Sequence, residues 1–118
     1  MKTMLTAVAV ALTLGAGVVQ AQNKPQATPQ TAAVCAMTAS ELQLLADQAL
    51  KGNMPADKRR ELEQMRQSYN GFIRVLVVRY SNNPQYQAGI PDAARVVAND
   101  SLEGNLRVFD TCQNIFLR

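Results

Sequence analysis

The chain of 118 residues contains no His and no Trp, and its aromatic residues are limited to three Tyr and three Phe. The absence of His removes the commonest metal ligand and the commonest general base at neutral pH. The two Cys are too far apart for a Cys-x-x-Cys redox motif or a clustered metal site. The six Gly form no phosphate-binding loop. These absences predict a protein that is not an enzyme and that holds no cofactor and no metal.

A strong charge of either sign is also missing. The formal net charge is +3, with 47% hydrophobic and 18% charged residues. This composition is typical of an ordinary globular chain, and the length allows one domain. Nucleic-acid binding calls for a larger excess of Lys and Arg together with exposed aromatic residues. The sequence therefore predicts no nucleic-acid partner.

The first residues are typical of a secretory signal peptide. Lys2 is followed by the uncharged, mostly apolar residues 4–19, and Val-Gln-Ala then precedes a cleavage site. A membrane anchor is the alternative, but the run is shorter than the ~20 residues that a bilayer requires and it contains Gly15 and Gly17. We therefore predict a signal peptide over 1–21, a periplasmic or secreted protein, and no integral membrane segment after cleavage.

The next segment has the composition of a flexible arm. Residues 22–34 read QNKPQATPQTAAV, rich in Gln and Pro and without a large apolar residue before Val34. Such a composition buries too little apolar surface to fold alone. The sequence predicts a flexible arm over 22–34 and a helical domain over 35–118.

A first helix is indicated after Thr38, because Thr38-Ala-Ser-Glu41 matches a capping box. The helix is expected to end at Gly52. One face carries apolar residues at helical spacing: Leu42, Leu45, Ala46, Ala49 and Leu50.

A second helix is expected from Pro55 to the polar cluster at 81–84. Residues 72–80 are rich in β-branched residues and are also compatible with a strand. We favour a helix because an apolar stripe at helical spacing passes through this segment in phase: Leu62, Met65, Tyr69, Phe72, Ile73, Leu76 and Tyr80. Since Val75, Val77 and Val78 lie off the stripe, we expect this half of the helix to be apolar on nearly all sides and central in the bundle.

The remaining residues predict a loop over 83–90 and a third helix from Pro91. Its expected inner face carries Ala94, Val97 and Ala98. A break near Asn99-Asp100 is indicated, because an unbroken helix would bury polar residues.

A fourth helix follows the break. Asp100-Ser-Leu-Glu103 matches a second capping box. Helix capping accounts for Asp100 and Glu103 better than the alternative in which the two carboxylates are the catalytic residues of a hydrolase. The expected inner stripe is Leu102, Leu106, Phe109, Cys112 and Phe116.

Cys35 and Cys112 lie near opposite ends of the predicted domain. In an oxidising compartment we expect them to form one structural disulfide, with two free buried thiols as the alternative. The predicted fold class is all-α: a small antiparallel bundle of three to four helices closed by one disulfide.

These features predict a non-enzymatic protein-binding module that acts on another envelope or secreted protein. An inhibitor, an immunity protein or an accessory factor of secretion or conjugation fits this description. The candidate partner-binding residues are an exposed apolar residue and a basic cluster: Leu44, Lys58, Arg59, Arg60 and Arg66. A merely solvated face is the simpler interpretation of this cluster.

An envelope chaperone or a carrier of a small hydrophobic ligand is the alternative function. In a carrier, small inner residues would leave a cavity: Ala46, Ala49, Ala94 and Ala98.

Overall fold

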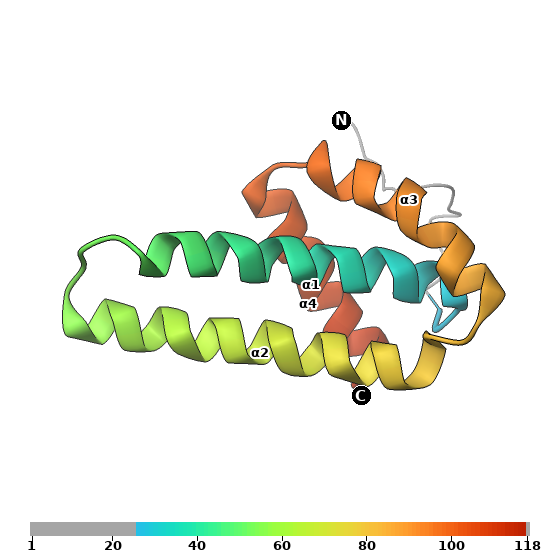
Figure 1. The fold of residues 1–118 in the computed structure, drawn as a ribbon, viewed down its shortest axis with the longest axis horizontal. Helices are drawn as coiled ribbons and strands as arrows, with labels where there is room; N and C mark the ends of the chain where they lie inside the picture. Colours follow the sequence, from blue (N-terminus) through green and yellow to red (C-terminus); the bar gives the residue numbers. More distant parts are fainter. Residues whose placement is uncertain (1–25, 118) are drawn as a thin grey trace.

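The computed structural model describes residues 26–117, which form four α-helices and no strand. They are α1 (Pro29–Leu50), α2 (Ala56–Tyr80), α3 (Pro84–Ala98) and α4 (Leu102–Phe116). α1 and α2 lie side by side, α3 packs against α1, and α4 crosses behind α1 (Figure 1). The predicted all-α antiparallel bundle with one disulfide is confirmed for these residues. The predicted signal peptide lies outside them.

α1 begins earlier than the capping box predicts. The Thr28 hydroxyl caps the helix by accepting the backbone N–H of Thr31 at 3.1 Å. Thr38, the predicted cap, lies inside α1, where its buried hydroxyl donates to the Val34 carbonyl oxygen at 2.7 Å. The prediction of a flexible arm over 22–34 is therefore wrong for the part that α1 includes.

Small side chains explain that difference. The absence of large apolar residues suggested a segment without a core, but five alanines of α1 are buried: Ala32, Ala33, Ala36, Ala39 and Ala46. Small side chains let neighbouring helices approach closely. A Cβ added at Gly89 of α3 would lie only 3.4 Å from the Ala33 Cβ. α1 packs against α2, α3 and α4 and is the central helix.

α2 is helical throughout, so the choice of helix over strand for 72–80 is confirmed. Its predicted central position is wrong. Tyr69, Phe72 and Leu76 are buried on one face, whereas Val77 and Val78 are exposed, Val78 to 84%. Large side chains on one face let α2 pack well on that side only, and the β-branched residues off the stripe face outward.

α3 begins at Pro84 rather than Pro91, which lies inside the helix. The Asn83 side chain caps α3 by accepting the backbone N–H of Gln85 at 2.9 Å. The predicted loop over 83–90 is thus wrong. The polar cluster at 81–84 indicates the end of the preceding helix, but Asn followed by Pro is an equally good helix start.

This earlier start also changes the buried face of α3. The buried residues are Tyr86, Ala93 and Val97. Val97 was predicted correctly, whereas Ala98 is exposed. Sequence reasoning missed Tyr86 because it placed that residue in a loop.

The predicted break between the last two helices is confirmed, because α3 ends at Ala98 and α4 begins at Leu102. The cap is Ser101 rather than Asp100: the Ser101 hydroxyl accepts the Gly104 N–H at 3.0 Å. The buried side chain of Asn105 donates to the Val97 carbonyl oxygen at 3.3 Å and ties α4 to the end of α3.

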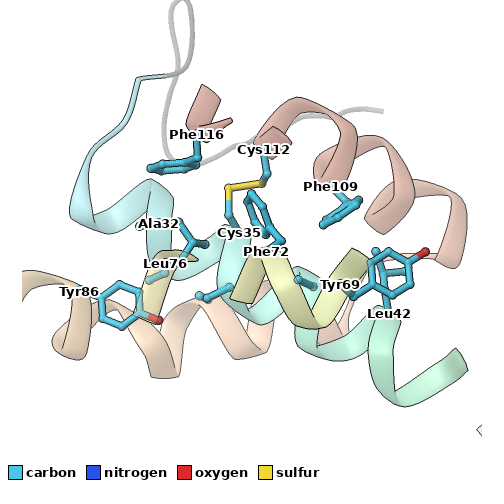
Figure 2. Close-up of a cluster of buried hydrophobic side chains, with 14 of the residues drawn as sticks. Ala32, Cys35, Leu42, Tyr69, Phe72, Leu76, Tyr86, Phe109, Cys112 and Phe116 are labelled. Carbon is cyan, nitrogen blue, oxygen red and sulfur yellow. A yellow bond between two sulfur atoms is a disulfide. The ribbon is translucent and has the colours of Figure 1, made fainter. Parts of the chain in front are cut away.

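The disulfide between Cys35 and Cys112 is confirmed, with 5.7 Å between the two Cα atoms across a sequence separation of 77. It joins α1 to α4 close to Phe72 (Figure 2). All the aromatic residues of the chain form one row of ring contacts, with centroid separations from 4.9 to 6.4 Å. The row runs Tyr69, Phe109, Phe72, Phe116, Tyr80, Tyr86. The disulfide and the rings form one continuous core to which all four helices contribute.

Candidate functional site

An open apolar groove of about 200 Å³ lies between the second half of α1, the first half of α2 and the start of α4. Its lining is almost entirely apolar: Leu42, Leu45, Ala46, Ala49, Leu62, Met65, Tyr69, Leu102 and Leu106. Concave apolar surfaces are the usual places where proteins bind their ligands. This groove is therefore the candidate functional site.

The floor of the groove follows from the predicted stripe on α1. Leu42 and Ala46 are buried against the neighbouring helices, while Leu45 and Ala49 continue the stripe towards solvent. Alanine methyl groups do not fill the space between α1 and α4 at this end. Because tight packing needs side chains that fill the space between helices, small residues here leave a groove.

The groove has an exposed apolar rim. Three lining side chains are partly open to solvent: Met65 to 42%, Leu102 to 55% and Leu106 to 37%. Single exposed apolar residues are common on protein surfaces, but a contiguous group around a concave site is typical of a binding surface.

Hydrogen bonds hold two walls of the groove in place. The Arg59 guanidinium donates to the Leu50 carbonyl oxygen at 2.9 Å and to the Gly52 carbonyl oxygen at 2.8 Å. These bonds fix the start of α2 to the end of α1, where helix carbonyls lack partners. The bonds of Ser101 and Asn105 fix the start of α4 in the same way.

Two ion pairs flank α2. Arg66 Nε lies 3.5 Å from Asp47 Oδ1 of α1, close enough for an ion pair but without hydrogen-bond geometry. Lys58 Nζ lies 3.8 Å from Glu61 Oε1 within α2, and both side chains are largely exposed. Pairs of this kind contribute little to stability but neutralise the charges involved.

The predicted partner-binding residues do not form one free surface. Lys58, Arg59 and Arg66 each contact other residues of the chain. Arg60 is exposed and makes no hydrogen bond or ion pair with any residue of 26–117. Leu44 is 52% exposed. That these residues bind a partner stays a prediction.

Leu44 also lies off the groove. It precedes the groove-lining Leu45 on α1, and successive side chains on a helix point about 100° apart. The exposed apolar residue that the sequence predicts is therefore beside the candidate site and not part of its lining.

Sequence reasoning missed Met65, Leu102 and Leu106 as surface residues, because all three belong to apolar stripes that predict a core. A stripe shows which side chains share a face, but it does not show how much of that face a neighbour covers. Of the small residues expected to line a carrier cavity, Ala46 and Ala49 do line the groove. Ala94 and Ala98 belong to α3, which contributes no lining residue.

The groove lining holds no charged side chain. Burial raises the pKa of the Tyr69 phenol above its ordinary value of 10.0. Asp100 accepts the Ser101 N–H at 2.8 Å and stabilises the turn before α4. Residues 26–117 contain no group of three or more His, Cys, Asp or Glu that could hold a metal ion. None of their helices is both long enough and apolar enough to cross a membrane.

Comparison with protein-family models, with curated proteins and with solved structures gives no match. The fold and the groove therefore define only a class, a disulfide-closed helical bundle with an apolar groove.

Proposed function

We propose that this protein is an exported, non-enzymatic binding module that holds an apolar segment of another protein in the groove between α1, α2 and α4. The observation that carries the proposal is the exposed apolar rim of Met65, Leu102 and Leu106 around a concave apolar floor. Burial of such a rim by a partner would remove apolar surface from water, which is the main favourable term in protein association.

The size of the groove favours a protein segment over a small ligand. Pockets that enclose a drug-sized molecule measure about 300–1,000 Å³, whereas this groove measures about 200 Å³ and is open to solvent. A few apolar side chains of a partner fit such a space without being enclosed. The carrier function remains the second candidate, supported by Ala46 and Ala49 in the groove lining.

The disulfide supports the proposed export. Stable disulfides are typical of the periplasm and of secreted proteins, since the cytosol keeps thiols reduced. The leader pattern of residues 1–21 supports the same location. Intact-mass analysis of freshly isolated protein after alkylation tests it: we expect a chain that begins at Gln22 and takes up no alkylating reagent. Two alkylated thiols would contradict export to an oxidising compartment.

Site-specific photo-crosslinking in the native host tests binding through the groove. A photoreactive amino acid replaces Leu106 at the rim or, as the matched control, Val78, which is exposed and apolar but outside the groove. We expect a discrete protein adduct from position 106 and none from position 78. Equal adduct patterns, or no adduct from position 106, would contradict the proposal. Native mass spectrometry that shows a co-purified lipid would favour the carrier function instead.

A further inference from the structure

The nine Asp and Glu residues of the chain are unevenly distributed. All of them lie within residues 41–63 and 92–110, so residues 26–40 and 64–91 contain no carboxylate side chain. These two acid-free segments include the first half of α1, the greater part of α2 and the start of α3. A positive charge on them therefore needs a counter-charge from another element of the fold or from a partner.

The fold brings the acid-free segments together at one end of the bundle. α1 and α2 are antiparallel, so the start of α1 lies beside the end of α2, and α3 begins at the same end (Figure 1). The ring of Tyr80 in α2 stacks on that of Tyr86 in α3 at a centroid distance of 6.0 Å. The groove lies towards the other end, because the second half of α1 and the first half of α2 line it.

Two arginines at the acid-free end carry uncompensated charge. Arg74 is exposed and makes no hydrogen bond or ion pair with any residue of 26–117. Arg79 donates to the Phe116 carbonyl oxygen at 3.4 Å, and this neutral acceptor does not cancel its charge. Residues three and four positions apart are neighbours on a helix, and around both arginines these positions hold Val, Leu, Gly or Asn but no carboxylate.

The second half of α4 also reaches this part of the bundle, and its one carboxylate is Asp110. Asp110 lies six positions before Phe116, so it is about 9 Å along the helix axis from the carbonyl that Arg79 contacts. Arg74 lies about 200° around α2 from Phe72, whose ring packs on α4, so Arg74 points away from α4. Asp110 forms no ion pair with either arginine.

Exposed valines lie between the two arginines. Val78 is 84% exposed, more than any other large hydrophobic side chain of 26–117, and Val77 is 43% exposed. Val78 is one helical turn from Arg74 and directly precedes Arg79. We call Arg74, Val77, Val78 and Arg79 the Val-Arg patch. It combines exposed apolar surface with two cations that no carboxylate of the described residues neutralises.

From these observations we infer that the Val-Arg patch binds the surface of a membrane that contains anionic lipids. The two guanidinium groups lie beside the lipid phosphates, and the valine side chains enter between the headgroups. Attraction to anionic lipids and burial of apolar surface are the two terms that hold proteins at a membrane interface. The bound protein keeps its groove accessible, because the groove lies towards the other end of the bundle.

A lipid surface fits this patch better than an acidic protein does. The outer surface of a helix is convex and Val78 protrudes from it, so a protein partner would need a complementary pocket to receive this side chain. A fluid headgroup layer adapts to a convex surface. The long Arg side chains reach the phosphates while their aliphatic parts stay beside the valines.

Co-sedimentation of the oxidised, mature protein with vesicles tests the inference. Vesicles of phosphatidylcholine alone are compared with vesicles that also contain phosphatidylglycerol, at low and at high salt. We expect about tenfold or stronger preference for the anionic vesicles at low salt, since each Arg near such a surface contributes about fivefold. The preference should shrink at high salt, which screens the charges.

Charge-reversal variants locate the binding surface. Arg74→Glu/Arg79→Glu should lower binding to the anionic vesicles about tenfold or more. The matched control Lys51→Glu/Arg60→Glu changes the net charge equally, but on exposed residues at the groove end. It should lower binding less than about threefold, because charges far from the contact surface are screened.

A single variant guards against misfolding. Arg74→Glu alone should lower binding to the anionic vesicles about fivefold. Because Arg74 makes no hydrogen bond or ion pair with residues 26–117, this variant should keep the fold even if loss of the Arg79 bond does not. Thermal melts show whether each variant is folded.

Trp substitutions report whether the valines enter the headgroup layer. The chain contains no Trp, so Val78→Trp introduces a single indole whose emission depends on its surroundings. We expect this emission to shift to shorter wavelength on vesicles with phosphatidylglycerol. The matched control is Val96→Trp on α3, where the residue is also apolar and exposed but lies outside the patch. Its emission should not shift.

Three results would overturn the inference. The first is equal binding to both kinds of vesicle, or equal losses from the two double variants. The second is an unshifted emission from Val78→Trp, because the valines would then remain in water. The third is binding of a soluble Glu-rich peptide, abolished by Arg74→Glu/Arg79→Glu, without binding to anionic vesicles, which would show that an acidic protein occupies the patch. Membrane binding does not depend on the groove, so the proposed groove function stands or fails separately, by crosslinking from position 106.

Discussion

At one end of the bundle the disulfide and a row of aromatic rings fill the space between α1, α2 and α4, whereas at the other end the same three helices leave an open groove. The transition from buried to exposed apolar side chains occurs along α4. Cys112 and Phe116 are buried at the end that the disulfide closes, which we call the stapled end. Phe109 lies at the junction, and Leu102 and Leu106 are exposed at the groove. Helices that pack well at one end are thus free to present apolar surface at the other.

The stability of this small domain and its proposed binding thus depend on different parts of the molecule, the disulfide-closed end and the groove end. A domain of this size has a marginal free energy of unfolding, and exposed apolar surface contributes nothing to it. A covalent bond and aromatic packing at one end compensate for the incomplete burial at the other. We expect substitutions in the stapled end to affect stability strongly and substitutions in the groove to affect it weakly.

The largest expected effect is the loss of the disulfide. A C35A/C112A double variant should lose about 4 kcal/mol of unfolding free energy in urea titrations, because the bond closes a long loop in the unfolded chain, with a separation of 77 positions. Reduction of the wild type should give a similar loss. An unchanged denaturation midpoint would remove the basis for distinguishing the two ends.

Phe72→Ala should have the next largest effect. Its buried ring contacts those of Phe109 and Phe116 at centroid distances of 5.3 and 6.4 Å. Truncation of such a side chain leaves a cavity and should cost about 3 kcal/mol or more. The matched control in the groove, Leu106→Ala, should cost much less, and equal losses would show that both ends are packed alike.

Within the groove end, Arg59→Ala should have a moderate effect. The substitution removes two charge-assisted hydrogen bonds to the Leu50 and Gly52 carbonyl oxygens. We expect a loss of about 1 to 2 kcal/mol in urea titrations. Arg60→Ala, which removes an exposed neighbour without such bonds, is the control and should change little. Equal effects of the two variants would contradict the role of Arg59 in holding the wall.

Alkaline pH should cause a smaller, selective loss of stability. Burial raises the pKa of Tyr69 and of Tyr86 in the folded protein above the ordinary value of 10.0. The folded state therefore keeps protons that the unfolded state releases, so stability is full below pH 10 and falls as the pH rises through the folded pKa. A Tyr69→Phe/Tyr86→Phe double variant should show a weaker fall of melting temperature above pH 10. If the melting temperature of the variant and that of the wild type fell equally above pH 10, the loss of stability would not come from Tyr69 and Tyr86.

The smallest expected effect on stability is that of Leu106→Ser at the rim. The side chain is already partly exposed, and surface substitutions of this kind change stability by about 0.5 kcal/mol or less. The same substitution should lower the yield of the protein adduct from a photoreactive residue at Leu102, the other rim position of α4. An unchanged adduct, or a large loss of stability, would show that Leu106 belongs to the core rather than to a binding site.

Much of the fold was predictable from local patterns. The helical class, the choice of helix for 72–80, the break before α4 and the disulfide pairing all followed from spacing and composition, and the structure confirms them. The starts of α1 and α3 were not predicted, since Thr28-Pro29 and Asn83-Pro84 competed with other start signals at Thr38 and Pro91. Where two helix-start signals of equal strength lie in the same segment, the sequence does not show at which of them the helix begins.

The candidate site was less predictable than the fold. The sequence identified the basic residues Arg59 and Arg66, but it did not show that their charges are used on a helix terminus and on Asp47. It placed Leu102 and Leu106 on an apolar face without showing that this face is left uncovered.

Amphipathic helices and two Cys available for one bridge can be derived from the sequence, because helical spacing and residue type are local properties. The packing of the helices is needed to show that alanine-rich α1 is the central helix, which end of α4 is buried, and which basic side chains are paired. These depend on how closely helices approach one another, and that distance is set by pairs of side chains far apart in the sequence.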